Sequence, residues 1–199
     1  MAEAQHEDVT QTIPAPEAGQ AAGGVARWAI DPAHSEVGFS IRHLMISSVK
    51  GRFGAFRGHL DFDEARPTEA AVDVEIDVAS IDTGSADRDA HLRSPEFFDA
   101  DACPTIRFVS RRVQPLDEDH FKVVGDLTLH GVTREVVLDV CYEGSGTDPW
   151  GNRRAGFTAN TKINRKDFDL TWNAALETGG VMVGEDVKIT LDIQAIKQG

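Results

Sequence analysis

The stretch DTGSADRDAHLRSPEFFDADACPTIRF, residues 82–108, is the one long interruption in a chain that otherwise alternates apolar and polar residues. Ser85 is a favourable helix N-cap, and Asp87 and Asp89 would lie in the first turn, where the helix dipole stabilises carboxylates. The stretch therefore predicts a helix that begins after Ser85.

A second, shorter helical turn is expected directly after this helix. Ser94 precedes Pro95, and proline fits the first position of a helix that follows a serine cap. This turn would present the rings of Phe97 and Phe98, and Pro104 would end it by favouring extended backbone at the residue before it. The whole insert should therefore cap the space that the strands enclose.

Regular alternation on both sides of the insert predicts β-strands with one buried face. Residues 106–113 are predicted to be one such strand, beginning with Ile106 and Phe108. In the other segments, the residues that share a face are Trp28 and Ile30; Val37, Phe39 and Ile41; Val72, Val74, Ile76 and Val78; Phe121, Val123, Leu127 and Leu129; Val136, Leu138, Val140 and Tyr142; Phe157, Ala159, Thr161 and Ile163; and Val187, Ile189, Leu191, Ile193 and Ala195. His130-Gly131 predicts a tight turn between two of these strands. Residues 144–154 are interpreted as a long polar connection, and residues 164–186 as a loop at the mouth of the fold.

The segment from Val49 to Asp63 changes phase along its length. Val49 and Phe53 share one parity, whereas the apolar residues from Phe56 onward share the other. A bulge or sharp bend near Gly54 within one strand would reconcile the two halves.

About eight strands in hairpin order with one helical insert predict an all-β fold, an extended antiparallel β-barrel of the lipocalin type. A two-sheet sandwich is the alternative, and the glycine-rich bend favours closure into a barrel. The length of 199 residues fits one domain of this kind. Residues 1–24 lack periodicity and large apolar side chains, so we expect a disordered tail before a barrel domain that spans residues 25–199.

Composition argues against several kinds of partner. The net charge of −13 disfavours nucleic acid and anionic membrane surfaces, because both require a clustered basic face. No run approaches the ~18 apolar residues of a membrane span, and the N-terminus has no export signal, so we expect a cytoplasmic chain without stable membrane insertion. Cys103 and Cys141 match no zinc pattern and are expected to be free thiols.

Blocks of sequence distributed along residues 27–196 resemble the YceI-like family of polyisoprenoid-binding proteins. In order, these blocks are HS, RHL, KGRFGAF, SIDTG, RDAHLRS, EFFDA, GDLTLHGVTR, INRKDF and VGEDVKI. The resemblance implies a lipocalin-like barrel that holds a long isoprenoid chain, such as a polyprenyl phosphate or an isoprenoid quinone, in an apolar tunnel. It also implies a homodimer and no cofactor apart from the bound lipid. Asp169 departs from the family, which usually has glycine there, and this puts the local turn in doubt.

The interior of an eight-stranded barrel can be filled by side chains or can hold one small ligand. Alternation alone favours a packed core, because protein cores fill to high density; the resemblance favours a tunnel. For a tunnel, the candidate apolar contacts are Phe39, Ile41, Phe53, Phe97, Phe98, Phe108, Leu127, Leu129, Phe157 and Phe168. The candidate polar residues at its mouth are His34, Arg42, His43, Arg88, Asp89 and His91, where arginine could pair with a phosphate and histidine could donate to an oxygen.

Each polar candidate also has a purely structural interpretation. Asp89 could cap the helix or pair with an arginine, and His34 and His43 could fix the ends of strands. A hydrolase acting on a small lipid-like ester is an alternative function, since Asp89, His91 and Ser94 lie within six positions. Their spacing argues against a catalytic triad, which separate elements normally assemble. Scattered histidines give no metal motif. A protein-interaction module without a ligand remains the third possibility.

Overall fold

The computed structural model describes residues 25–175 and 181–199. The tail predicted to be disordered, residues 1–24, lies outside the described residues, and so does part of the predicted mouth loop, residues 176–180. Cys103 and Cys141 are free thiols in the structure. None of the helices in the described ranges has the length and apolar character required to cross a membrane.

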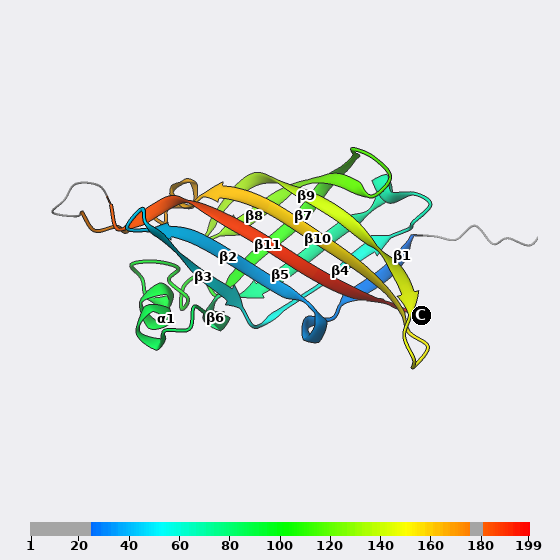
Figure 1. Ribbon diagram of the computed structural model, residues 1–199, viewed down its shortest axis with the longest axis horizontal. Helices are drawn as coiled ribbons and strands as arrows, with labels where there is room; N and C mark the ends of the chain where they lie inside the picture. Colours follow the sequence, from blue (N-terminus) through cyan, green and yellow to red (C-terminus); the bar gives the residue numbers. More distant parts are fainter. Residues whose placement is uncertain (1–24, 176–180) are drawn as a thin grey trace, which may run out of the picture.

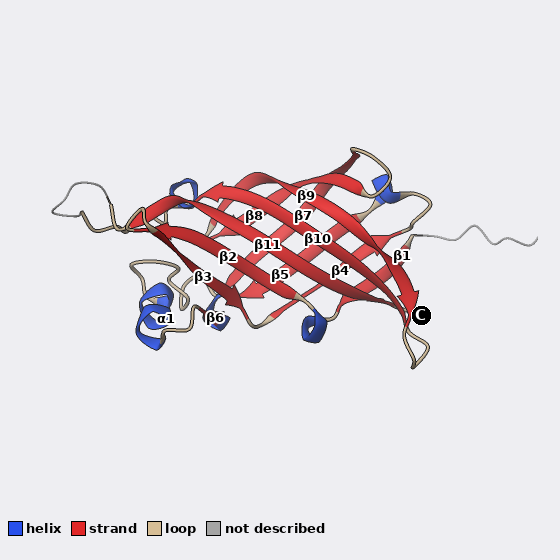
Figure 2. Ribbon diagram, viewed as in Figure 1, coloured by secondary structure: helices blue, strands red, loops and turns tan. Residues whose placement is uncertain are grey.

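The described residues form eleven strands, one α-helix and four short 3₁₀ turns (Figure 2). The strands are β1 (Ala26–Ile30), β2 (Glu36–His43), β3 (Ser47–Phe53), β4 (Phe56–Phe62), β5 (Ala71–Asp77), β6 (Ile81–Asp82), β7 (Thr105–Pro115), β8 (His120–Leu129), β9 (Val132–Thr147), β10 (Arg153–Asn164) and β11 (Val183–Lys197). The helix is α1 (Ala86–Arg93), and the 3₁₀ turns are η1 (Pro32–His34), η2 (Pro67–Glu69), η3 (Val78–Ser80) and η4 (Arg165–Phe168).

Eight of the described strands close into an antiparallel barrel. Around the wall they follow the order β1-β4-β5-β7-β8-β9-β10-β11, and β11 pairs again with β1. This closure confirms the predicted barrel and excludes the sandwich. Consecutive strands are mostly neighbours, as expected for hairpin connections.

Two strands, β1 and β2, pair with different parts of the same edge of β11. Its last residues, Ala195–Lys197, pair with β1, whereas Val183–Asp192 pair with β2. Strand β2 then pairs with β3, and β3 pairs with the two-residue strand β6. Pairing with β1 therefore closes the wall of the barrel near the C-terminus. Nearer to α1, the wall continues through β2, β3 and β6 (Figure 1).

The segment from Val49 to Asp63 is two strands, and the prediction of one bent strand is wrong. The chain leaves the ladder at Gly54 and Ala55, between β3 and β4. Strand β3 pairs with β2 and β6, whereas β4 pairs with β1 and β5. The change of phase in the sequence marks the point where the chain passes from one part of the wall to another.

The helical insert agrees with the sequence in its first half only. Helix α1 starts directly after Ser85, although the Ser85 side chain makes no capping hydrogen bond. The second predicted helical turn is instead a hydrogen-bonded turn, in which the Phe97 amide donates to the Ser94 carbonyl over 3.0 Å. Asp99 interrupts any helix there, because its φ of 49° is left-handed.

Two connections differ from the prediction in length. Residues 144–147 belong to β9, so the polar connection shrinks to residues 148–152, where the Asp148 carboxylate accepts hydrogen bonds from the amides of Trp150 and Asn152. The loop after β10 begins with η4 and ends at Val183. Asp169 follows η4 with a φ of 59°, a conformation that favours glycine and that aspartate tolerates better than most residues.

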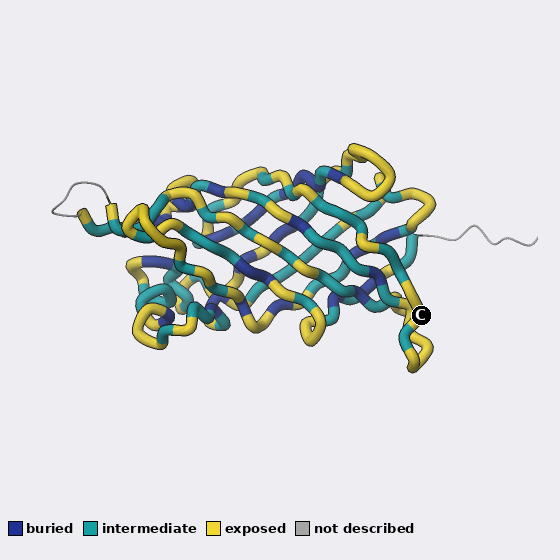
Figure 3. The backbone as a smooth tube through the Cα atoms, viewed as in Figure 1, coloured by how far each residue is buried: buried dark blue, intermediate teal, exposed yellow. Residues whose placement is uncertain are grey.

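Buried residues alternate with exposed ones along the strands (Figure 3), as the sequence pattern predicts. Val78 is an exception to its predicted place, because it belongs to η3 and not to β5, although its side chain is still buried. The turn between β2 and β3 and helix α1 lie at one end of the barrel, and β1 and the C-terminus lie at the other (Figure 1).

Candidate ligand-binding cavity

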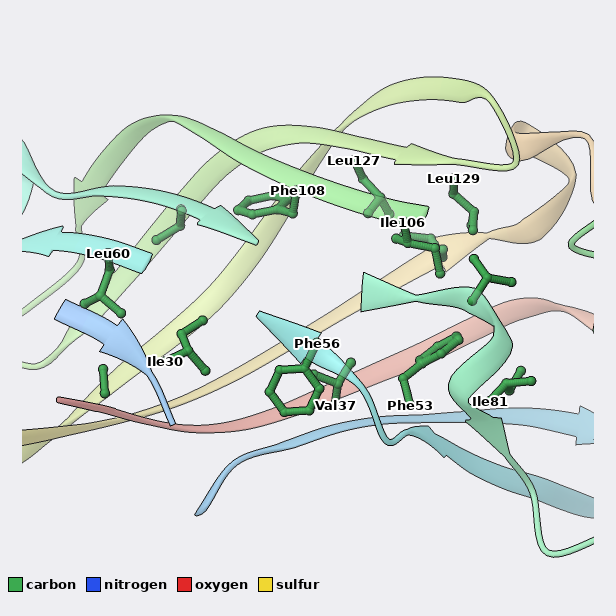
Figure 4. Close-up of a cluster of buried hydrophobic side chains, with 14 of the residues drawn as sticks. Ile30, Val37, Phe53, Phe56, Leu60, Ile81, Ile106, Phe108, Leu127 and Leu129 are labelled. Carbon is green, nitrogen blue, oxygen red and sulfur yellow. The ribbon is translucent and has the colours of Figure 1, made fainter. Parts of the chain in front are cut away.

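The barrel encloses a cavity of about 580 Å³. This volume falls within the range of about 300–1,000 Å³ that is typical of small-molecule sites. Side chains from strands far apart in sequence point toward the common interior, as Figure 4 shows for Ile30, Leu60, Phe108 and Leu127. The packed core predicted from alternation alone is therefore not found. The interior is hollow, as the resemblance implies.

Two glycines help to keep the interior open. A Cβ atom at Gly125 would lie 2.5 Å from Cζ of Phe108, and one at Gly51 would lie 2.4 Å from Cζ of Phe39. Both rings therefore lie against the wall, over residues without side chains. Because the rings occupy the space beside these glycines, they leave part of the barrel interior free.

Aromatic rings pack together at the end of the cavity away from α1. Phe62 lies 5.3 Å from Tyr142 and 5.2 Å from Phe157, measured between ring centroids, and Trp28 packs edge-on against Phe62. The Trp28 indole also donates a hydrogen bond of 3.1 Å to the Phe62 carbonyl. This end of the cavity is apolar and belongs to the part of the barrel closed by β1.

Polar side chains gather at the other end, near α1. The residues there that line the cavity are His43, Thr83, Asp87, Arg88, His91, Arg165 and Trp172. Asp87 and Arg88 are solvent-exposed, whereas Arg165 is 3% exposed. The cavity thus has an apolar interior and a polar mouth, an arrangement that suits an amphiphile with one polar end.

Hydrogen bonds fix the position of Arg88 at this mouth. Its Nε donates to the Thr83 hydroxyl over 2.7 Å and its Nη2 to the Thr83 carbonyl over 2.8 Å. The same hydroxyl donates to the buried Asp89 carboxylate over 2.5 Å, and the Thr83 amide donates to it over 2.9 Å. Asp89 therefore positions Thr83, and through it Arg88.

His91 is held by three neighbours. Its Nε2 lies 2.7 Å from the Glu96 carboxylate, and its ring stands edge-on to Phe97 and Trp172 at 5.0 and 4.9 Å. Trp172 and Phe97 also contact each other, 5.0 Å apart. These contacts join α1, the turn after it and the loop before β11 into one rim.

The sequence interpretation missed four residues of the mouth, namely Thr83, Asp87, Trp172 and Arg165, of which Arg165 is the most deeply buried. Its Nε donates to the Gly184 carbonyl over 2.8 Å and its Nη1 to the Leu170 carbonyl. Burial lowers the pKa of its guanidinium, and the nearby Glu185 carboxylate partly opposes this. A signal was present, because Arg165 continues the inward alternation of Phe157, Ala159, Thr161 and Ile163.

Twelve of the predicted ligand contacts line the cavity. They are Phe39, Ile41, His43, Phe53, Arg88, His91, Phe97, Phe98, Phe108, Leu127, Leu129 and Phe157. The structure therefore brings both the predicted apolar contacts and part of the predicted polar mouth to one space.

The other four candidates, His34, Arg42, Asp89 and Phe168, do not line the cavity. His34 is exposed in η1 and contacts Asp31 at 2.8 Å. Arg42 points to the outer side of β2, where it donates to the Met45 carbonyl. Asp89 is a buried residue of α1, and Phe168, the last residue of η4, is 1% exposed and packs in the core. Strand alternation explains why Arg42 points outward, because its neighbours Ile41 and His43 both point into the cavity.

The residues considered as a catalytic triad have separate partners. Asp89 accepts from Thr83, His91 contacts Glu96, and the Ser94 hydroxyl donates to the His91 carbonyl over 2.8 Å. No nucleophile–base–acid relay connects the three side chains within the described residues. Among the same residues, no group of three histidine, cysteine or acidic side chains could hold a metal ion.

The closed barrel with its apolar cavity and polar mouth defines a lipocalin-like binding fold. A family model described as the YceI-like domain matches residues 28–195, and the chain belongs to the YceI-like family. A UPF0312 protein of Vibrio parahaemolyticus is 41% identical over 138 residues, which cover 69% of this chain and 73% of that protein.

Solved structures show the same fold. The Campylobacter jejuni YceI protein is 34% identical, with a TM-score of 0.68 over 85% of this chain and 96% of that one. A structure described as a polyisoprenoid binding domain from Saccharophagus degradans has a TM-score of 0.65 over 87% of this chain and 99% of that one. At 18% identity, the second likeness concerns the fold alone.

Proposed function

We propose that this protein binds a long-chain isoprenoid lipid inside the barrel and stores or carries it. The observation that carries the proposal is the hollow interior, about 580 Å³, lined by aliphatic and aromatic side chains from one end to the other. Membership of the YceI-like family and the described ligand class of the Saccharophagus degradans domain support it.

Apolar burial is sufficient to retain such a ligand. Each CH₂-sized group removed from water contributes about 0.8 kcal/mol, so a five-carbon unit contributes about 4 kcal/mol before the cost of immobilisation. A few units in the cavity would reach micromolar affinity. Binding without turnover fits the site better than ester hydrolysis, because the candidate triad residues engage three unrelated partners.

Native mass spectrometry followed by extraction into organic solvent tests this function. The protein purified from its host should carry a prenyl-chain lipid in stoichiometric amount, and the extracted mass should show steps of one isoprene unit. Release of a fatty acid or phosphate from model esters by the purified protein would instead favour the hydrolase. A ligand-free protein that also fails to bind added prenyl lipids would end the proposal.

A variant that blocks the interior provides a matched comparison. Ala159 lines the cavity and is 6% exposed, while its neighbour Asn160 is exposed on the outer face. Ala159→Phe should weaken binding of a twenty-carbon prenyl alcohol by about tenfold or more, since the added ring occupies the path of the chain. Asn160→Phe should bind it like the unmodified protein. Equal binding by both variants would place the ligand elsewhere.

A further inference from the structure

The arginines of this acidic protein fall into two groups. Nine of the fourteen form an ion pair with a carboxylate, among them Arg27, Arg107 and Arg154. Among the described residues, the arginines outside such pairs are Arg42, Arg88, Arg93, Arg134 and Arg165. Arg88 and Arg165 are the members of this second group that line the cavity. Positive charge without a matching carboxylate therefore faces the mouth.

Arg165 is the more unusual of these two residues. Arg165 is only 3% exposed to solvent. Its Nη2 has no hydrogen-bond partner in the part of the chain that the structure describes. Its other two nitrogens bind backbone carbonyls, from Gly184 and Leu170. Leaving a buried charged donor unsatisfied is strongly unfavourable, and buried charges are usually paired.

The neighbourhood does not supply the missing acceptor. Glu185 is the nearby carboxylate, and it pairs with Lys166 instead, at 2.5 Å. Asp87 also lines the mouth, but it is solvent-exposed, and among the described residues it forms no ion pair with Arg165. A guanidinium in a water-poor pocket binds carboxylate or phosphate oxygens with strong, directional hydrogen bonds.

From this unpaired donor we infer that Arg165 binds an anionic head group, a phosphate or a carboxylate, on the lipid that occupies the cavity. This inference rests on the proposed function and adds the chemical class of the head group. The exposed charge of Arg88, held in place by Thr83 and Asp89, would attract the same anion to the mouth. The apolar chain then lies in the barrel and the head group lies at the α1 end. A neutral quinone or alcohol leaves the guanidinium without a counter-ion.

Three probes with the same twenty-carbon chain test the assignment: geranylgeranyl phosphate, geranylgeranoic acid and geranylgeraniol. The protein should bind at least one of the two acids about tenfold to a hundredfold more tightly than the alcohol. The arm that shows the larger preference identifies phosphate or carboxylate. If all three bind equally, the lipid-binding function stands and the inference falls. If none binds, the proposed function itself falls.

Substitution then assigns the preference to one residue. Arg165→Gln should abolish the preference for the acids while the affinity for the alcohol stays unchanged. Arg42→Gln is the matched control, because Arg42 is exposed on the outer side of β2, does not line the cavity, and donates to the Met45 carbonyl over 2.8 Å. A preference that survives Arg165→Gln would overturn the assignment.

A second measurement avoids dependence on the folding of Arg165→Gln. In the unmodified protein labelled with ¹⁵N-arginine, the buried Nε resonance should shift on addition of the preferred acid and stay in place on addition of the alcohol. Arg165→Lys, which keeps the charge, identifies that resonance by its loss. Equal shifts with acid and alcohol would contradict direct contact with the head group.

Discussion

Arg154 joins three segments at the end of the barrel away from α1. Its Nε lies 2.7 Å from the Asp148 carboxylate, in the turn between β9 and β10, and its Nη1 lies 2.7 Å from Asp31, just before η1. Nη1 also reaches the Gln194 side chain in β11. Arg154 and its hydrogen bonds lower the pKa of the Asp148 carboxyl well below its ordinary value.

This lowered pKa predicts a specific dependence of stability on pH. The carboxylate of Asp148 contributes stability above its ordinary pKa of 3.8, and the contribution disappears as the pH falls toward the lower pKa of the folded state. Asp148→Asn should therefore unfold at lower urea than the unmodified protein at pH 7, and the gap should narrow below about pH 4. Asp139→Asn, in an exposed pair with Lys122, should show little change at either pH. A gap that widens in acid would contradict the explanation.

Gly125 gives a second prediction at the scale of one residue. An added Cβ would lie 2.5 Å from both the Val109 carbonyl oxygen and the Phe108 ring, and the backbone oxygen has no freedom to move aside. Gly125→Ala should lower the free energy of unfolding by about 1–3 kcal/mol, the usual effect of overpacking. Gly146→Ala, with no atom within 4 Å of its added Cβ, is the control and should be nearly neutral in a urea titration. Similar losses in both variants would refute the steric explanation.

Single residues were predictable from the sequence where alternation decides their direction. It places Phe39, Phe108 and Leu127 on the inner face, and the structure confirms this. It also contains the signal for Arg165, which continues the parity of Phe157 and Ile163 two residues beyond the predicted end of that strand. Alternation does not show that Gly51 and Gly125 leave space for rings from neighbouring strands. That space depends on cross-strand register, which is a long-range property.

At the scale of single elements, the turn between β2 and β3 has a strained backbone. Leu44 and Met45 have φ values of 52° and 59°, in the left-handed region that side chains disfavour. The side chains of Met45 and Ile46 are 59% and 81% exposed, so burial does not explain their presence. Asn-Gly is the sequence that such turns favour.

The paired substitution Leu44→Asn and Met45→Gly should therefore stabilise the protein by about 1 kcal/mol, as the relief of strain outweighs the added freedom of the unfolded chain. Thermal unfolding followed by circular dichroism measures the change. Ile46→Gly is the comparison, because Ile46 has an ordinary φ, and it should lower the melting temperature. If the paired variant melts earlier than the unmodified protein, the turn is not strained in the way described.

The helical insert shows where prediction of an element succeeds and where it fails. Local signals, a cap residue and first-turn acids, suffice to start α1 at the correct residue. They fail after Ser94, because the chain there folds back so that Phe97 contacts both His91 of α1 and Trp172, and Trp172 comes from the distant loop before β11. The same holds for β3 and β4, whose boundary depends on which strands they pair with.

For the molecule as a whole, the two parts of the wall should differ in local stability. Strand β10 pairs with β11 over residues 154–164 and with β9 over residues 153–160, whereas β3 pairs with β2 on one side and through two residues with β6 on the other. A strand that lacks a neighbouring strand along one edge exchanges its amide hydrogens through small local openings.

Hydrogen exchange measured by mass spectrometry should therefore be faster in peptides that cover residues 47–51 than in peptides that cover residues 154–160, which have strand partners on both sides. A bound lipid should slow exchange most in α1 and in β2 and β3, since these elements line the mouth. Uniform protection of both regions in the lipid-free protein would show that the barrel opens only as one unit.

The first and last strands of the barrel meet at one place, where Trp28 lies opposite Lys197 and the Gln198 amide donates to the Arg27 carbonyl over 2.8 Å. A short peptide could therefore join these two points and new ends could be cut between β2 and β3, giving a circular permutant with the same set of neighbours. The same geometry means that a tag, surface or fused enzyme attached beside either of these strands would face away from α1 and leave the entrance free.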